Sequence, residues 1–219
     1  IIEHIIKFFV KSNSLHFIIA LGYKGEKIVE YFTRKKITQK IQKNLKKGYV
    51  IKKTYLEKKC TIKFLNTGLK TMTGGRVKQS LKLVQNKNCF LTYGDGISNV
   101  NLKKLFKLHE QKKKLVTVTA VNPQSRFGEL KIRNKKVVDF SEKHKMLESW
   151  INGGFFVINK KFIKLIKNNS TILEREPLEK AARSGELVAY KHFGFWQCMD
   201  TKRDKDNLNR IFKKNKKFI

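Results

Sequence analysis

The sequence predicts an α/β fold, a Rossmann-like mixed and mainly parallel sheet flanked by helices, with antiparallel strands added late in the chain. Two observations lead to this prediction. Over residues 1–121, apolar extended runs alternate with amphipathic helical segments, as in strands joined by crossover helices. From about residue 126 the extended pieces become short and are joined by turns, which indicates antiparallel strands. The 219 residues are enough for one sizeable domain.

The elements follow in order. An amphipathic helix opens the chain, with Ile2, Ile5, Ile6 and Phe9 on one face. Helices are also expected at 25–35, 74–86 and 101–114, the last with Asn101 as its N-cap. Strands are expected at 15–23, 48–55, 60–66, 88–93 and 115–121. The later part predicts strands at 127–132, 136–142, 151–159, 187–192 and 194–199, and helices at 160–168, at 175–184 and from residue 201.

The charge of the chain raises one alternative function. Fifty Lys and Arg against 17 Asp and Glu give a net charge of +33, which suggests a basic nucleic-acid-binding protein. The lysines are spread over the whole chain, however, and Ile, Asn and Phe are abundant too. These residues share A/T-rich codons, so coding bias explains the charge at least as well. We therefore expect salt-sensitive, non-specific binding to polyanions and no specific nucleic-acid partner.

The cysteines and the lengths of the apolar runs indicate where in the cell the protein is expected. Cys60, Cys89 and Cys198 form no C-x-x-C pair, which argues against a zinc site or a disulfide framework and fits the reducing cytoplasm. No apolar run approaches the roughly 20 residues of a membrane helix, so no membrane partner is expected. The first residue is Ile rather than Met, and we expect the N-terminus of a longer chain to be missing.

Two aspartates are candidate metal ligands. Asp95 ends the apolar strand of "FLTYGDGISNV" between Gly94 and Gly96, either in a tight turn or as a metal ligand with room beside it for a phosphate. Ligands of open α/β sheets bind at the carboxyl ends of strands. Asp200 closes the strand "FGFWQCMD" in the same way. Its alternative role is the N-cap of the last helix, for which Thr201 is equally suited.

Other motifs could meet an anion or a sugar. In "TMTGGRVK" two glycines precede a helix, so that backbone amides could approach an anion, and Arg76 adds a fork suited to phosphate. The alternative is a glycine-containing loop with a surface arginine. Glu142 and Lys143 could hold a sugar hydroxyl and a phosphate, or form a solvated charge pair. His109 is expected to be a core or edge histidine rather than a ligand.

Glycines also interrupt the strand "WINGGFFVIN", directly after Asn152. Glycine weakens a strand unless close backbone approach is needed there, and a β-bulge is the alternative explanation for Gly153 and Gly154.

The order of these motifs resembles the sugar nucleotidyltransferases, and among them the glucose-1-phosphate cytidylyltransferases. TMTGGR, TYGDG, INGGFF and GFWQ-x-MDT carry a resemblance that spans nearly the whole chain. It implies the nucleotide-diphospho-sugar transferase fold in one domain, residues 1–219. It also implies synthesis of CDP-glucose and pyrophosphate from CTP and α-D-glucose 1-phosphate, a Mg²⁺ cofactor and a homo-oligomer.

The resemblance also implies roles for individual residues. Asp95 and Asp200 match the magnesium carboxylates, and the nucleotide-binding positions are Thr71, Arg76 and Gly94. The sugar phosphate would meet Glu142 and Lys143, and the sugar would meet Asn152 and Gly153. Asp95, Arg76 and Lys143 would bear directly on the reaction.

The chain departs from the family pattern at its start. The family begins with a strand, a G-G-x-G-T-R loop and a Pro-Lys-Pro lysine, and Ile1 aligns just after them. We therefore expect the 219 residues to lack the first central strand and to be inactive or impaired as given. "EKH" in place of Glu-Lys-Pro, and Cys198 where Pro is common, leave the sugar specificity open. A degenerate, non-catalytic paralogue that binds sugar nucleotides is a further alternative.

Overall fold

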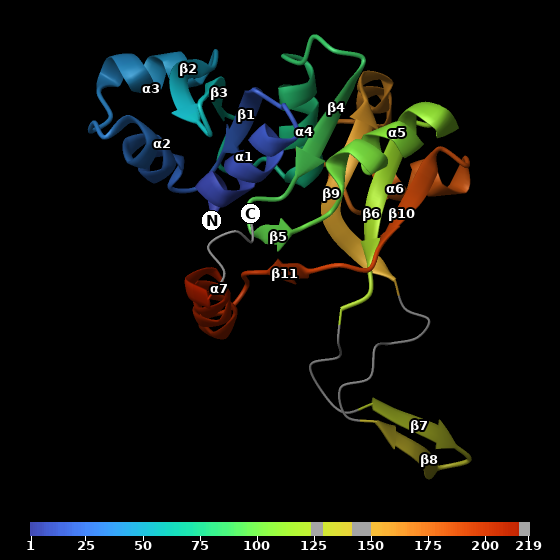
Figure 1. The fold of residues 1–219 in the computed structure, drawn as a ribbon. Helices are drawn as coiled ribbons and strands as arrows, with labels where there is room; N and C mark the ends of the chain where they lie inside the picture. Colours follow the sequence, from blue (N-terminus) through green and yellow to red (C-terminus); the bar gives the residue numbers. More distant parts are fainter. Residues whose placement is uncertain (124–128, 142–149, 215–219) are drawn as a thin grey trace.

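The computed structural model describes residues 1–123, 129–141 and 150–214 (Figure 1). In this part of the chain it contains helices, two larger sheets and two small two-stranded sheets. No helix among the described residues is both long and apolar enough to cross a membrane.

The first sheet has the strand order β1-β3-β2. Its strands are β1 (His16–Leu21), β2 (Tyr49–Tyr55) and β3 (Lys58–Asn66), with β1 parallel to β3 and β2 antiparallel to it. Three helices accompany it: α1 (Ile2–Lys11), α2 (Gly25–Thr33) and α3 (Gln39–Leu45). Helix α3 was not predicted, because only Leu45 of its residues is buried and its sequence shows no apolar period.

The second sheet has the order β10-β6-β9-β4 and carries most of the remaining chain. Its strands are β4 (Asn88–Thr92), β6 (Val116–Val121), β9 (Ile151–Asn159) and β10 (Leu187–His192). Strand β10 runs parallel to β6, and β9 runs antiparallel to both β4 and β6. The accompanying helices are α4 (Thr73–Leu81), α5 (Leu102–Lys112), the 3₁₀ helix η1 (Lys160–Leu165) and α6 (Glu176–Arg183).

Two short ladders complete the fold. Strand β5 (Gly96–Ser98) pairs antiparallel with β11 (Trp196–Cys198), just before the last helix, α7 (Lys202–Lys214). Strands β7 (Glu129–Arg133) and β8 (Lys136–Ser141) form a hairpin that lies apart from the two larger sheets in Figure 1.

The mixed α/β architecture is confirmed, with helices flanking sheets that hold both parallel and antiparallel strands. Among the described residues, two strand pairs are parallel, β1–β3 and β10–β6, and five are antiparallel. The antiparallel pairs come partly from the late strands, as expected. Strand β9, which inserts between β4 and β6, is one of these late strands, and the remaining antiparallel pair is the β2–β3 hairpin.

Helix α1 ties the two larger sheets together. Ile6 and Val10 pack into the core beneath the first sheet with Ile62 and Phe64. Ile5 and Phe9, on the same helix, pack into a second cluster with residues of α5 and β9. The predicted apolar face of the opening helix is therefore confirmed.

His109 is a core residue, as expected. It is 1% exposed, and its Nδ1 lies 2.9 Å from Thr117 Oγ1, which is also buried. Burial lowers the pKa of His109, because the charged imidazolium would lose its hydration.

Candidate active site

Asp95 and Asp200 lie at the same end of the β5–β11 ladder. Gly96, the first residue of β5, pairs with Cys198, the last residue of β11. The Met199 amide then donates to the Asp95 carbonyl at 2.9 Å, which extends the ladder by one more bond. Asp95 directly precedes β5 and Asp200 follows β11 by two residues, and both side chains are exposed. Two carboxylates that are 105 positions apart (200 − 95) are thus brought to one edge.

The alternative role of Asp200, as the N-cap of α7, is filled by other residues. Thr201 Oγ1 accepts from the Asp204 amide at 3.1 Å, and Asp204 Oδ2 accepts from the Thr201 amide at 3.0 Å. This reciprocal pair is a capping box. The Asp200 carboxylate accepts from Cys198 Sγ at 3.1 Å and faces solvent.

The donor set at this edge fits a magnesium ion. Mg²⁺ is usually held by one or two carboxylates and completes its shell with water and phosphate oxygens. Among the described residues, no group of three or more His, Cys, Asp or Glu side chains could hold a metal by itself. A metal ion held by Asp95 and Asp200 would need its other ligands from water or a substrate.

Gly94 leaves open space beside Asp95. A Cβ built on Gly94 would meet no heavy atom of the described residues within 4 Å, and the backbone there is outside the left-handed region. Neither packing nor conformation requires glycine at this position. A physical reason for glycine at position 94 could be that it leaves room for a ligand.

The glycines at the start of α4 have a different reason. A Cβ on Gly75 would lie 2.5 Å from the Asn169 carbonyl oxygen, so glycine allows the helix to pack on this loop. The amides of Gly74 and Gly75 both donate to the Thr171 carbonyl, at 2.9 and 3.3 Å. These amides were expected to approach an anion, but an anion here would have to displace those hydrogen bonds.

Thr71 and Arg76 are both held by backbone near the end of β1. The Thr71 hydroxyl is buried and donates to the Thr67 carbonyl at 2.6 Å. Arg76 Nη1 donates to the Leu21 carbonyl at 2.9 Å and to Thr67 Oγ1, and the guanidinium lies against Gly22. Arginine has five N–H donors in a fixed fork, so these bonds orient the group and leave other donors for a ligand.

A hydrogen-bonded network joins three of the sequence motifs. Tyr93 of TYGDG donates its hydroxyl to Glu174 Oε1 at 2.7 Å, and Asn152 Nδ2 of INGGFF donates to Tyr93 Oη at 3.1 Å. Thr73 of TMTGGR donates to Glu174 Oε2 at 2.8 Å. Burial and the Glu174 carboxylate raise the pKa of Tyr93 well above its usual value, so the hydroxyl stays protonated. We call Thr73, Tyr93, Asn152 and Glu174 the tyrosine network.

Gly153 shows both of the features that the sequence left as alternatives. The β6–β9 register shifts between Val118 and Ala120, which is a bulge or irregularity. A Cβ on Gly153 would also lie 2.9 Å from the Thr119 carbonyl oxygen, which is a close backbone approach. The Gly153 carbonyl accepts from Trp196 Nε1 at 2.7 Å, and this bond ties β11 to β9.

The structure thus gathers some predicted residues and leaves others apart. Asp95 and Asp200 share one edge, and Asn152 joins Tyr93, two residues from Asp95, in the network. Glu142 and Lys143 lie outside the described residues. Sequence reasoning missed Tyr93, Glu174 and Trp196 as site residues. All three stand inside stretches that carry the family resemblance, Glu174 as the first residue of EREPLEKAARSGEL, but no role was assigned to any of them.

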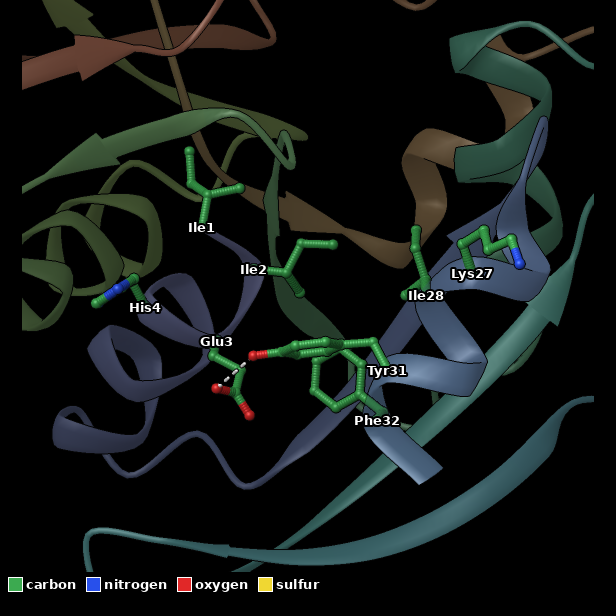
Figure 2. A pocket seen from close by; sticks show the side chains of 8 residues that line it. All are labelled: Ile1, Ile2, Glu3, His4, Lys27, Ile28, Tyr31 and Phe32. Atoms are coloured by element: carbon green, nitrogen blue, oxygen red, sulfur yellow. Dashed lines mark hydrogen bonds between the residues drawn. The ribbon is translucent and has the colours of Figure 1, made fainter. Parts of the chain in front are cut away.

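A separate cavity of about 320 Å³ lies between α1 and α2 (Figure 2). Its wall includes Glu3 from the first turn of α1, and Lys27 and Tyr31 from α2. Figure 2 shows the Tyr31 hydroxyl directed at the Glu3 carboxylate, a hydrogen bond of 3.1 Å. None of the predicted site residues that the structure describes lines this cavity.

Comparison with known proteins agrees with these motifs. Residues 1–197 match the family described as Nucleotidyl transferase. Glucose-1-phosphate cytidylyltransferase of Salmonella typhimurium is 39% identical over 222 aligned residues, which cover 99% of this chain and 85% of that protein. The enzyme of the same name from Salmonella typhi matches at the same identity and coverage.

The fold has a counterpart among solved structures. HddC from Yersinia pseudotuberculosis superposes with a TM-score of 0.69 at 17% sequence identity, covering 95% of this chain and 84% of that one. At this identity the likeness concerns the fold. Together, the match over residues 1–197 and the relatives at 39% identity assign this chain to the nucleotidyl transferase family.

Proposed function

We propose that the protein transfers the cytidylyl group of CTP to α-D-glucose 1-phosphate, giving CDP-glucose and pyrophosphate. The observation that carries this proposal is 39% identity, over 99% of the chain, to an enzyme named glucose-1-phosphate cytidylyltransferase. The paired carboxylates and the open space at Gly94 support a nucleotide site.

In this reaction a phosphate oxygen of the sugar phosphate attacks the α-phosphorus of CTP. The bond from that phosphorus to the oxygen that bridges it to the β-phosphate breaks, and pyrophosphate leaves with the electron pair. Two anions must meet, so the site has to offset their repulsion and align them. No covalent intermediate with a protein side chain is needed.

The residues take the following parts. Asp95 and Asp200 would hold a magnesium ion, and that ion would neutralise phosphate charge when bound. Arg76 presents the remaining N–H donors of its fork to the nucleotide phosphates, and Gly94 leaves room for the nucleotide. Thr71 supports the same region through its bond to the Thr67 carbonyl.

On the sugar side, Asn152 and Gly153 bind the glucose, and Glu142 and Lys143 meet the sugar phosphate. Asn152 is an exposed member of the tyrosine network, which is consistent with contact to a polar ligand. The Gly153 carbonyl already accepts from Trp196, and its second lone pair could accept from a sugar hydroxyl.

The two larger sheets end on strands that are apolar yet only half-buried. Strand β1 contains Phe17, Ile18 and Ile19, and β4 contains Phe90 and Leu91. Strands buried on both faces read as such apolar runs. We infer that a further strand pairs with these edges in the working enzyme, as the family pattern implies. Amides of β1 and β4 would then be protected from hydrogen exchange in the natural full-length protein.

Self-association and location complete the proposal. The β7–β8 hairpin exposes Leu130, Ile132 and Phe140 by 53%, 61% and 66%, and an apolar surface of this kind favours a homo-oligomer. Light scattering should show that a Phe140→Ser variant no longer forms the homo-oligomer. The free thiols of Cys60, Cys89 and Cys198 fit a reducing compartment, and we place the enzyme in the cytoplasm.

The direct experiment measures pyrophosphate release by the natural full-length protein with CTP, magnesium and glucose 1-phosphate. UTP, dTTP and GTP replace CTP in parallel assays, and other sugar 1-phosphates replace glucose 1-phosphate. We expect turnover with CTP well above that of an Asp95→Asn variant. Turnover no higher than the variant's with every pair of substrates would reject the proposal.

A further inference from the structure

The tyrosine network has a fixed direction of hydrogen bonding. Thr73 Oγ1 accepts from the Leu173 amide at 2.9 Å and directs its own proton to Glu174. Tyr93 has a single hydroxyl proton, which goes to the other oxygen of Glu174. The Tyr93 oxygen can therefore only accept from the Asn152 side chain.

The other end of Asn152 agrees with this direction. Its Oδ1 accepts from the Gly154 amide at 2.8 Å, so the carbonyl half of the side chain faces the strand and Nδ2 faces Tyr93. Both neighbours require the same orientation of the amide group. Nδ2 carries two N–H donors, and the second remains for an acceptor on a ligand.

Packing holds Tyr93 in place. Gly154 has a φ of 75°, and a Cβ there would lie 2.7 Å from the tyrosine ring, so the ring covers a backbone position that favours glycine. The ring also packs edge-on against Phe156, with centroids 5.8 Å apart. The hydroxyl therefore cannot swing away from Asn152 without losing these contacts.

We propose that Tyr93 and Glu174 are positioning residues that hold the Asn152 side chain with an N–H donor directed at a hydroxyl oxygen of the sugar phosphate. The inference rests on the proposed function, which places Asn152 on the sugar side of the site. Asn152 touches the substrate, whereas Tyr93 and Glu174 act through it.

The test uses Tyr93→Phe in the natural full-length protein, since this change removes the hydroxyl and keeps the ring on Gly154 and Phe156. We expect KM for glucose 1-phosphate to rise about tenfold, a factor typical of one lost hydrogen bond, while KM for CTP stays within about twofold. Tyr31→Phe is the matched control, because it removes another tyrosine–glutamate hydrogen bond away from the site (Figure 2). It should leave both KM values unchanged.

A double-mutant cycle separates positioning from a direct role. If Tyr93 acts through Asn152, Tyr93→Phe should add less than about twofold to the KM for glucose 1-phosphate in an Asn152→Ala background. Effects that multiply in the double variant, an equal rise in both KM values, or no rise at all would overturn the inference.

Failure of the proposed function looks different, since the unaltered protein would then release no pyrophosphate. In that case the same variants are titrated with CDP-glucose by calorimetry, and the same pattern is expected in Kd. Absence of the pattern, or of any binding by the unaltered protein, would overturn the inference.

Discussion

Replacing Gly94 with alanine should raise the stability of the protein and lower its affinity for CTP. The new Cβ meets no described heavy atom within 4 Å and the backbone is not left-handed, so the folded state accepts it without strain. The unfolded chain loses conformational freedom, which stabilises the fold by about 0.4–1 kcal/mol. For a chain of this size, Tm should rise by about 1–4 °C.

The same methyl group would occupy space that we assign to the nucleotide. Overfilling a packed site typically costs about 1–3 kcal/mol, which corresponds to a rise of about 5- to 150-fold in KM for CTP. Thermal unfolding of the unliganded protein and steady-state kinetics give the two quantities.

Gly153→Ala serves as the contrasting control. Its Cβ would lie 2.8 Å from Val121 Cγ1 and 2.9 Å from the Thr119 carbonyl, so this variant should lose about 1–3 kcal/mol of stability without any ligand. A Tm for Gly94→Ala that falls as in the control would mean that Gly94 serves the fold. An unchanged KM for CTP would refute the nucleotide assignment.

Three further outcomes are expected. Asp95→Asn and Asp200→Asn should each remove most activity with little change in Tm, because both side chains are exposed; a matching loss of Tm would indicate a structural role. A Cβ at Gly22 would lie 2.5 Å from Arg76 Nη2, so Gly22→Ala should displace the guanidinium and raise KM for CTP as Arg76→Ala does, and unequal effects would contradict this. The pKa of His109 is lowered in the fold, so the unfolded chain binds more protons and stability should fall as pH drops below about 6.5. Urea midpoints at several pH values should show a smaller fall in His109→Gln.

Periodicity predicted those elements whose faces are unequal. Helix α1 buries Ile5, Ile6 and Phe9 on the face that its apolar spacing indicated, and Asn101 caps α5 through its side chain at 2.9 Å. Helix α3 escaped prediction because it buries one residue, Leu45. Strand β5 has three residues, too few for a period, and it exists because β11 pairs with it.

The sequence could predict the candidate site only as separate local motifs, and not how these motifs come together. Asp95 and Asp200 could be singled out because each ends an apolar run, but their common edge depends on the β5–β11 register. Glu174 binds Tyr93 and Thr73, which are 81 and 101 positions away, and no local pattern points to these partners. Hydrogen bonds between distant segments leave no periodic signal, so the tyrosine network required the fold.

Glycine within a motif has two different meanings here, and the sequence cannot separate them. Gly75 and Gly153 sit where a Cβ would lie within 3 Å of a backbone oxygen, so their absence of a side chain builds the frame. Gly94 sits where a Cβ would meet nothing among the described atoms, so packing does not require its lack of a side chain. The candidate site depends on this framework. Gly75 allows close packing of α4, which carries Arg76, and the Gly153 carbonyl binds Trp196 of β11, the strand that precedes Asp200. Substitutions at Gly75 or Gly153 should therefore lower stability and activity together. A substitution at Gly94 should lower activity without lowering stability.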